Sequence, residues 1–336
     1  MLRLVLATLF AAVLPLAAQA QAPTTLRIAD VYPVGHYIAA ALVVPWMQRV
    51  RQQMGGQVDL QYFPAEQLGK GRELLHFTQQ GVVDIGLVIP SFVPDQLPLS
   101  AVAELPGAFT TACQGSGAFW TLVHGGLLAD KEYTPNGLRV LFATVLPPYQ
   151  IFSRLPLDGI ASFRGQKLYS TGGAKDLTLR QLGAVPTRMT TAEVYQAMSR
   201  GTIDGGVMSY ATALAYRLPG LVHAGTSGEN FGSGVITYAI AEARWAKLPP
   251  RLQQAMTDAG EAVTRSACAS FDRGVDDDMA RLEKDGVRLV RLPEADHAAI
   301  AQEAAVVAGA WSKELDDRGK PGSAVLAAFR NALAAP

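Results

Sequence analysis

Alternation between strand-like and helix-like periodicity restricts the fold of this chain more than any other feature. Residues 25–31 and 58–63 show the two-residue alternation of half-buried strands, and residues 84–89 form a short apolar run. Between them, residues 37–54 and 66–80 carry apolar side chains at helical spacing. Strand–helix–strand–helix–strand is the pattern of a mainly parallel sheet covered by helices, so we expect an α/β unit here.

A second α/β unit is predicted further along the chain. The expected helices are 174–183 and 191–200, and the expected strands are 138–144, 149–153, 166–170, 186–189 and 205–209. Residues 235–242 form another apolar strand, which offers a route back to the first unit. The sequence therefore predicts two lobes, each built on its own sheet.

The longest predicted element is a helix from Pro249 to about Lys284. It begins at Pro249-Pro250, and proline is tolerated in the first helical turn. At 1.5 Å per residue such a helix spans ~50 Å, which is longer than one lobe, so it could brace both. Further helices are expected at 295–317 and 324–336.

Charge and composition exclude some classes of partner. The 336 residues include 29 basic and 29 acidic side chains, and no basic stripe is visible. Nucleic acid and anionic membrane surfaces are therefore poor candidates for partners. The 49% hydrophobic content is enough for a sizeable core.

The N-terminus has the features of a secretory signal peptide. Arg3 supplies a positive charge, an apolar run covers residues 4–16, and Ala18-Gln19-Ala20 resembles a cleavage site. We predict that residues 1–20 are removed on export to the periplasm and that the mature chain does not insert into the membrane. The run is short for a membrane span of ~20 residues.

The chain has two cysteines, Cys113 and Cys268, both within predicted helices. The periplasm is oxidising, so a disulfide that closes a long loop is one interpretation. Two buried, inert thiols are the other. The sequence alone does not decide between them.

The residue constellations of common enzymes are missing from the sequence. It contains no G-x-S-x-G, H-E-x-x-H or C-x-x-C motif, and its five histidines are scattered. The acidic run at 276–278 lies in a predicted helix, where consecutive side chains face different directions. We predict a protein that is not an enzyme and that needs no cofactor and no metal.

Several short motifs, in order and at matching spacing, resemble the extracytoplasmic solute receptors of tripartite ATP-independent periplasmic (TRAP) transporters, the DctP-like family. Together they cover nearly the whole mature chain. The motifs are YFPAEQLG (62–69), GVVDIG (81–86), FRGQKL (163–168), LGAVP (182–186), EVYQAM (193–198), GTIDG (201–205) and WAKLPPRLQ (245–253).

The resemblance implies a two-lobed periplasmic binding protein, α/β in class, with crossing strands and a long bracing helix. We expect residues 21–145 plus 235–274 in the first lobe and 146–234 plus 275–336 in the second. The lobes would close over a small organic solute, usually an organic or aromatic acid. The loaded receptor, a monomer in most of the family, would dock on the membrane subunits of an ion-driven TRAP permease. A ligand-presenting protein for a sensor kinase and, more remotely, a secreted enzyme using Glu193 with Tyr169 are the alternatives.

The chain departs from the family at the position that matters most for the solute. A carboxylate-binding arginine usually follows the Lys-Leu pair, but here Lys167-Leu168 is followed by Tyr169. Tyr149 and Met208 also stand where more polar residues are common. The residues that the resemblance and the strand ends nominate for the ligand are His36, Phe92, Tyr149, Tyr169, Thr171, Arg188, Met208, Tyr210 and Phe231.

Three interpretations of the missing arginine remain open. Another cation could replace it, and Arg188, Arg154 and Lys175 are the candidates. Tyrosine and threonine hydroxyls, together with Ser170 and backbone groups, could hold a carboxylate instead. Alternatively, the solute is less polar or uncharged, and the aromatic residues contact its body.

Overall fold

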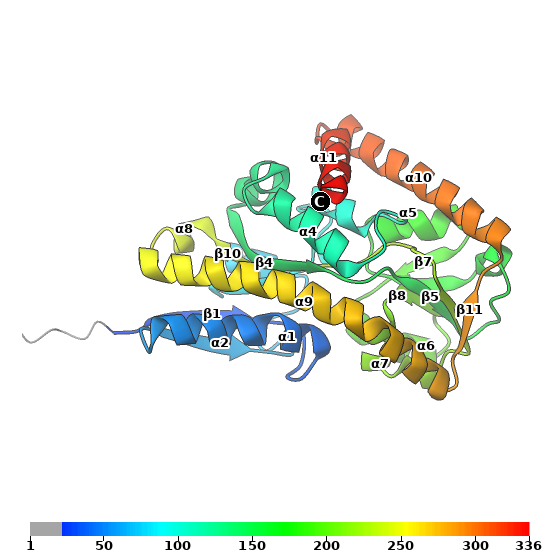
Figure 1. The fold of residues 1–336 in the computed structure, drawn as a ribbon, viewed down its shortest axis with the longest axis horizontal. Coiled ribbons are helices and arrows are strands. Elements are labelled where there is room, and N and C mark those ends of the chain that lie inside the picture. The colour runs from blue at the N-terminus through cyan, green and yellow to red at the C-terminus, as the bar shows by residue number, and fades with distance from the viewer. Residues whose placement is uncertain (1–21, 336) are drawn as a thin grey trace, which may run out of the picture.

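The computed structural model describes residues 22–335 of the chain (Figure 1). The predicted signal peptide, residues 1–20, lies outside the described residues. Two sheets, each flanked by helices, form the body of the molecule (Figure 1). The predicted α/β fold with two sheets is therefore confirmed.

The first sheet has five strands in the order β2-β1-β3-β10-β4. Strand β1 runs parallel to β2 and β3, whereas β10 is antiparallel to both β3 and β4. The late strand β10 is buried along its whole length, which explains its continuous apolar sequence. The strands are β1 (Thr24–Ala29), β2 (Val58–Phe63), β3 (Ile85–Val88), β4 (Leu138–Val145) and β10 (Val235–Ala241).

The second sheet has six strands in the order β11-β9-β5-β8-β6-β7. Strand β6 is parallel to β7 and β8, and β5 is antiparallel to β8 and β9. The return of β10 to the first sheet means that the chain crosses between the sheets more than once. The strands are β5 (Gln150–Ser153), β6 (Lys167–Ser170), β7 (Val185–Arg188), β8 (Gly205–Met208), β9 (Ala224–Ser227) and β11 (Arg288–Arg291).

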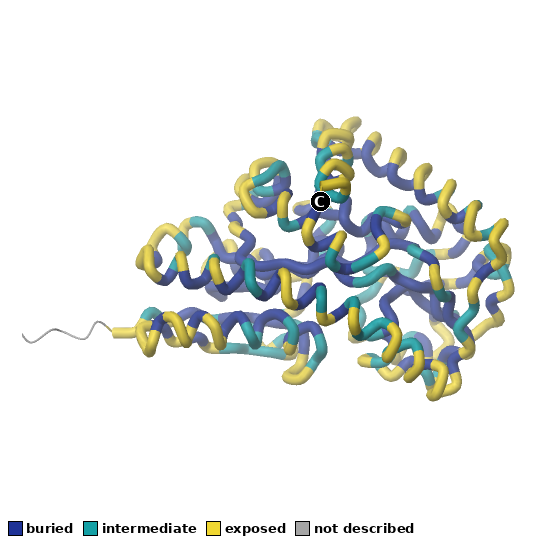
Figure 2. Tube along the Cα trace, viewed as in Figure 1, coloured by how far each residue is buried: buried dark blue, intermediate teal, exposed yellow. Residues whose placement is uncertain are grey.

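Helices cover the sheets, and Figure 2 shows that their outer faces are exposed while most strand residues are buried. Helix α11 packs against α4 and α10, so the end of the chain lies on the α4 side of the first sheet. Apart from the long helix described next, the α-helices are α1 (Tyr37–Ala41), α2 (Val43–Met54), α3 (Leu74–Gln79), α4 (Ala112–Val123), α5 (Ala174–Gln181), α6 (Val194–Ser199), α7 (Tyr210–Ala215), α8 (Glu242–Trp245), α10 (Glu294–Asp317) and α11 (Gly322–Ala334).

The long helix α9 (Pro250–Lys284, 35 residues) runs past both sheets, as predicted (Figure 1). It packs against α2, α4 and β4 beside the first sheet and against α7 and β11 beside the second. Gly260 brings the helix close to the first sheet, because a Cβ at this position would overlap the carbonyl oxygen of Leu141. Helix α9 is thus a rigid brace shared by the two halves of the molecule.

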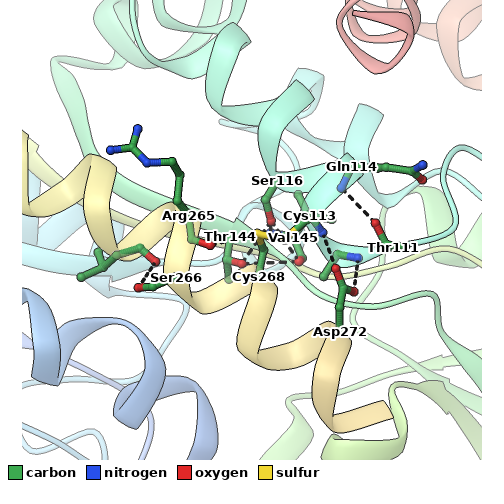
Figure 3. Close-up of a disulfide and its surroundings, with 12 residues drawn as sticks. Thr111, Cys113, Gln114, Ser116, Thr144, Val145, Arg265, Ser266, Cys268 and Asp272 are labelled. Atoms are coloured by element: carbon green, nitrogen blue, oxygen red, sulfur yellow. Dashed lines mark hydrogen bonds between the residues drawn. A yellow bond between two sulfur atoms is a disulfide. The ribbon is translucent and has the colours of Figure 1, made fainter. Parts of the chain in front are cut away.

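A disulfide between Cys113 and Cys268 joins α4 to α9 (Figure 3). Next to it, the carboxylate of Asp272 on α9 accepts hydrogen bonds from the backbone N–H groups of Ala112 and Cys113, at 2.6 and 3.0 Å. These two groups are unpaired donors of the first turn of α4, so Asp272 caps that helix from outside. Of the two interpretations of the cysteines, the structure shows the disulfide.

Some predicted elements differ in extent. The helix predicted at 37–54 is divided at Leu42 into α1 and α2, and the helix predicted at 66–80 shortens to α3. Ala65 and Glu66 have positive φ angles, 53° and 60°, which a helix does not allow. Within residues 22–335, no helix combines the length and apolar character that a membrane crossing requires.

Candidate functional site

A cavity of about 40 Å³ lies between the two sheets and receives side chains from both. The lining segments follow β1, β3, β6 and β8 at their carboxyl ends, where ligands bind in open α/β sheets. The segment before β5 and the start of β10 complete the wall. The lining residues are Tyr32, His36, Ile38, Ile89, Ser91, Phe92, Leu146, Tyr149, Tyr169, Thr171, Thr191, Val207, Met208, Thr212, Tyr216, Gly234, Val235 and Ile236.

The cavity wall is aromatic and neutral. Among the residues that the structure describes, four tyrosines, one phenylalanine and one histidine line it, and no lysine, arginine, aspartate or glutamate does. Burial raises the pKa of Tyr149 and of Tyr169, so both hydroxyls stay protonated at physiological pH. Hydrogen bonds and apolar contacts are therefore the interactions that this wall offers a ligand.

His36 occupies the N-cap position of α1 and reaches the cavity. Its Nδ1 accepts a hydrogen bond of 3.3 Å from the backbone N–H of Ile38, which places the proton of the neutral ring on Nε2. The ring stacks on Tyr32, with 4.3 Å between the ring centroids. Burial lowers the pKa of His36 to about 4, so the ring is neutral near pH 7.

Two buried polar atoms in this wall, His36 Nε2 and Thr171 Oγ1, have no hydrogen-bond partner within residues 22–335. Buried polar groups of native proteins are nearly always paired, with protein, water or ligand. The neighbouring Tyr169 hydroxyl, by contrast, is already hydrogen-bonded to Thr191 Oγ1 at 2.7 Å. The two unpaired atoms are thus available to a bound solute.

A hydrogen bond between the two halves of the molecule lies beside the cavity. Tyr37 at the start of α1 shares a hydrogen bond of 2.8 Å with Thr212 Oγ1 on α7. Its hydroxyl is also 3.5 Å from Ser209 Oγ. Helix α1 follows the first strand of the first sheet and α7 follows β8 of the second. This contact therefore joins the two sides of the cavity.

Six of the nine residues nominated from the sequence lie in the cavity wall. These are His36, Phe92, Tyr149, Tyr169, Thr171 and Met208. The wall also contains residues that the sequence analysis did not nominate. Tyr32 follows the first strand directly and could have been found by the same strand-end argument, whereas Thr212 and Tyr216 belong to the region of α7, a helix that was not predicted.

The other three nominated residues lie outside the cavity wall. Arg188, whose side chain is 57% exposed, forms an ion pair with the buried Asp176 and faces another hollow. The hydroxyl of Tyr210 donates a hydrogen bond of 3.2 Å to the carbonyl of Thr226. Phe231 is fully buried and meets Phe163 edge to face, with 5.6 Å between the ring centroids.

Lys175 and Arg154, the other two cations that could replace the missing arginine, also lie outside the cavity wall. Lys175 is buried, but its Nζ lies 2.6 Å from Glu104 Oε2 in an ion pair. Arg154 is exposed. Among the described residues, no group of three or more histidine, cysteine or acidic side chains is arranged to hold a metal ion.

Comparison with known proteins identifies the family of the chain. Residues 28–314 match the model of the bacterial extracellular solute-binding protein family 7, DctP. The protein named outer membrane transporter protein TsaT, from Comamonas testosteroni, is 27% identical over 341 residues, which cover 99% of this chain and 98% of TsaT.

Solved structures share the fold. A TRAP periplasmic solute-binding protein from Bordetella bronchiseptica with bound mandelate is 24% identical, with a TM-score of 0.83 over 93% of this chain and 99% of that one. A TRAP solute-binding protein from Rhodoferax ferrireducens with copurified benzoate is 23% identical, with a TM-score of 0.85 over 93% and 98%. Because the family model spans most of the sequence, the chain belongs to the DctP family of bacterial extracellular solute-binding proteins.

Proposed function

We propose that the protein is a periplasmic receptor that captures a small organic solute in the central cavity and delivers it to a TRAP-type, ion-driven permease. The observation that carries this proposal is the closed cavity between the sheets, with two buried polar atoms that lack a partner. Membership of the DctP family supports the same role. Residues 1–20 would act as the signal peptide, and the mature receptor would work without entering the membrane.

The two sheets would belong to separate lobes that close over the solute. In this proposal the first lobe comprises 21–145 plus 235–274, and the second comprises 146–234 plus 275–336. The Tyr37–Thr212 hydrogen bond would form on closure, and α9 would hold the lobes in register. A solute shifts such an equilibrium only through contacts that it makes in the closed state, which here include His36 and Thr171.

Organic acids are the first solutes to test, because the ligands named in the related structures, mandelate and benzoate, are organic acids. A binding role is favoured over catalysis by the environment of Glu193, the residue considered as an acid–base partner of Tyr169. Its carboxylate accepts hydrogen bonds from Thr190 in a capping box. It is therefore engaged in helix initiation.

A thermal-shift screen of the purified mature protein tests this proposal. A solute present at 100 times its dissociation constant should stabilise the protein by about 2.7 kcal/mol, a readily measured rise in melting temperature. Isothermal titration would then give the affinity, and uptake by cells lacking the gene would test delivery to a permease. Binding without any effect of the deletion on uptake would contradict the transport role.

A further inference from the structure

The groups that the cavity offers to a solute are hydrogen-bonding groups without charge. His36 Nε2 carries a proton and has no acceptor, since Nδ1 is occupied by the backbone of Ile38. Thr171 Oγ1 can donate or accept and also has no partner. The remaining wall is mainly aromatic and aliphatic. An oxygen that accepts from His36, on a compact organic body, would satisfy these groups.

A negatively charged solute would find no compensating cation in this wall. Lys175 is a buried cation, but it is already paired. Its Nζ lies 2.6 Å from Glu104 Oε2 and donates a hydrogen bond of 3.2 Å to the carbonyl of Ser233. Arg188 is bound to Asp176 outside the cavity. Burial of a charge without a partner is strongly unfavourable, so a carboxylate would lose its hydration here and gain no ion pair in return.

The charged groups that contribute to the raised pKa values of the cavity tyrosines are, moreover, carboxylates. Asp30 is 1% exposed and accepts hydrogen bonds from the hydroxyls of Tyr62 and Tyr238, at 2.8 and 2.7 Å. Burial is the main cause that raises the pKa of Tyr32 and Tyr216, two residues of the cavity wall, and the charge of Asp30 acts in the same direction. Glu104, although paired with Lys175, acts in the same direction on Tyr149 and Tyr169. The surroundings of the cavity thus disfavour an anion.

We infer that, if the receptor role proposed above is correct, its solute is a small uncharged organic compound and not a carboxylate. The chemical class is a compact amide, lactam, ketone or alcohol, or the protonated form of an acid. One oxygen accepts from His36 Nε2–H, a second polar group meets Thr171 Oγ1, and the carbon skeleton packs on the aromatic wall. A volume of about 40 Å³ accommodates only a few groups the size of water, since one water needs roughly 10–15 Å³ on the same measure.

Matched pairs of acid and amide test this inference by isothermal titration of the mature protein. Acetate with acetamide probes the smallest body, and lactate with lactamide probes one that carries an additional hydroxyl. At pH 8 we expect the amide of a productive pair to bind at least tenfold more tightly than the carboxylate. Between pH 8 and pH 6.5 the affinity for the acid should rise about thirtyfold, following its protonated fraction, while that for the amide stays constant.

Variants at position 171 connect this preference to the cavity. Thr171→Val keeps the shape of the side chain but removes Oγ1, and should weaken amide binding about tenfold. Thr171→Ser keeps the hydroxyl and should stay within about threefold of the wild type. Equal affinities of both variants would show that the solute does not use this hydroxyl and would contradict the inference.

The outcomes separate the inference from the receptor role. Tighter binding of the carboxylate than of its amide at pH 8 would overturn the inference and leave the receptor role intact. Binding of a cationic probe such as choline, without binding of any amide, would also overturn it. If no acid, amide or alcohol in a broad screen binds, the receptor role is wrong as well.

Discussion

Two neighbouring buried regions between the sheets use polar groups in opposite ways. The central cavity is lined by neutral groups, two of which have no hydrogen-bond partner among the described residues. Beside it lies a closed ion pair between Glu104 and Lys175, whose side chains are 0% and 2% exposed. Lys175 also donates to the carbonyl of Ser233, which lies just before β10 in the segment that returns the chain to the first sheet.

The difference follows from what each region has to do. The ion pair fixes α5, on the second sheet, to Glu104, which lies between β3 and α4. The hydrogen bond from Lys175 to Ser233 fixes α5 to the crossing segment, and neither contact has to be replaced by a solute. A buried charge is tolerated there because its partner is always present. In the proposed receptor role the cavity would exchange contacts with a solute, and neutral groups lose less when they are desolvated without that solute. Charged groups thus form the permanent Glu104–Lys175 contact, and neutral hydrogen-bonding groups line the cavity, where contacts with a solute would be transient.

The largest expected effect comes from breaking the ion pair between Glu104 and Lys175. Lys175→Met leaves Glu104 buried without a partner and should lower the free energy of unfolding by about 3–5 kcal/mol. Denaturant unfolding measures this change. The double variant Lys175→Met/Glu104→Gln removes both charges and should recover at least half of the loss. If it is no more stable than the single variant, the ion pair does not have the role assigned to it.

Removal of the disulfide should have a smaller effect on stability and little effect on the cavity. The two cysteines are 155 residues apart, so the bond restricts a long loop in the unfolded chain. Cys113→Ala/Cys268→Ala should cost about 2–4 kcal/mol. The disulfide joins α4 and α9, both packed on β4, so solute affinity should remain within about threefold. Reductant should destabilise the wild type and leave the double variant unchanged.

Overfilling the cavity should separate binding from stability. A Cβ at Gly234 would overlap the hydroxyl of Tyr149, so Gly234→Ala forces that ring to move. Overpacking of this kind costs about 1–3 kcal/mol, and we expect solute affinity to fall at least tenfold. Adding Tyr149→Phe removes the overlapping oxygen and should restore affinity to that of Tyr149→Phe alone. Unchanged affinity of Gly234→Ala would place the solute away from this side of the cavity.

The sequence predicted the architecture well because periodicity encodes it. The long helix was found from its spacing of apolar residues and its proline start, and the structure places it at Pro250–Lys284. Strand β10 was recognised by its apolar run. The helix predicted at 66–80 was too long, because the positive φ angles of Ala65 and Glu66 arise from the surrounding loop and leave no mark on the pattern.

The candidate site was less predictable, since ion pairing and side-chain direction depend on tertiary contacts. Arg188 is paired with Asp176, which lies on a different element, and no periodicity relates the two residues. Phe231 and Tyr210 are aromatic like the lining residues, but they pack into the core. Tyr216 was missed because it follows α7, a helix too short to give a clear pattern.

The smallest expected effect is a pH dependence of solute affinity that arises from His36. The rings around His36 are Tyr32, Tyr37 and Tyr216, all of them uncharged near neutral pH. Burial lowers the pKa of His36 to about 4, whereas an imidazole exposed by opening of the lobes would return towards 6.5. Between these two values the open form therefore binds more protons than the closed form.

Affinity for an uncharged solute should consequently be nearly constant above pH 6.5 and fall as the pH drops from 6.5 towards 4, by about tenfold at pH 5.5. Titration calorimetry with the amide identified above measures this directly. His36→Asn keeps a side-chain acceptor that can cap α1 but cannot be protonated, so its affinity should be independent of pH in this range. A similar pH dependence in His36→Asn would assign the effect to another group and would remove His36 from the set of contacts broken on opening.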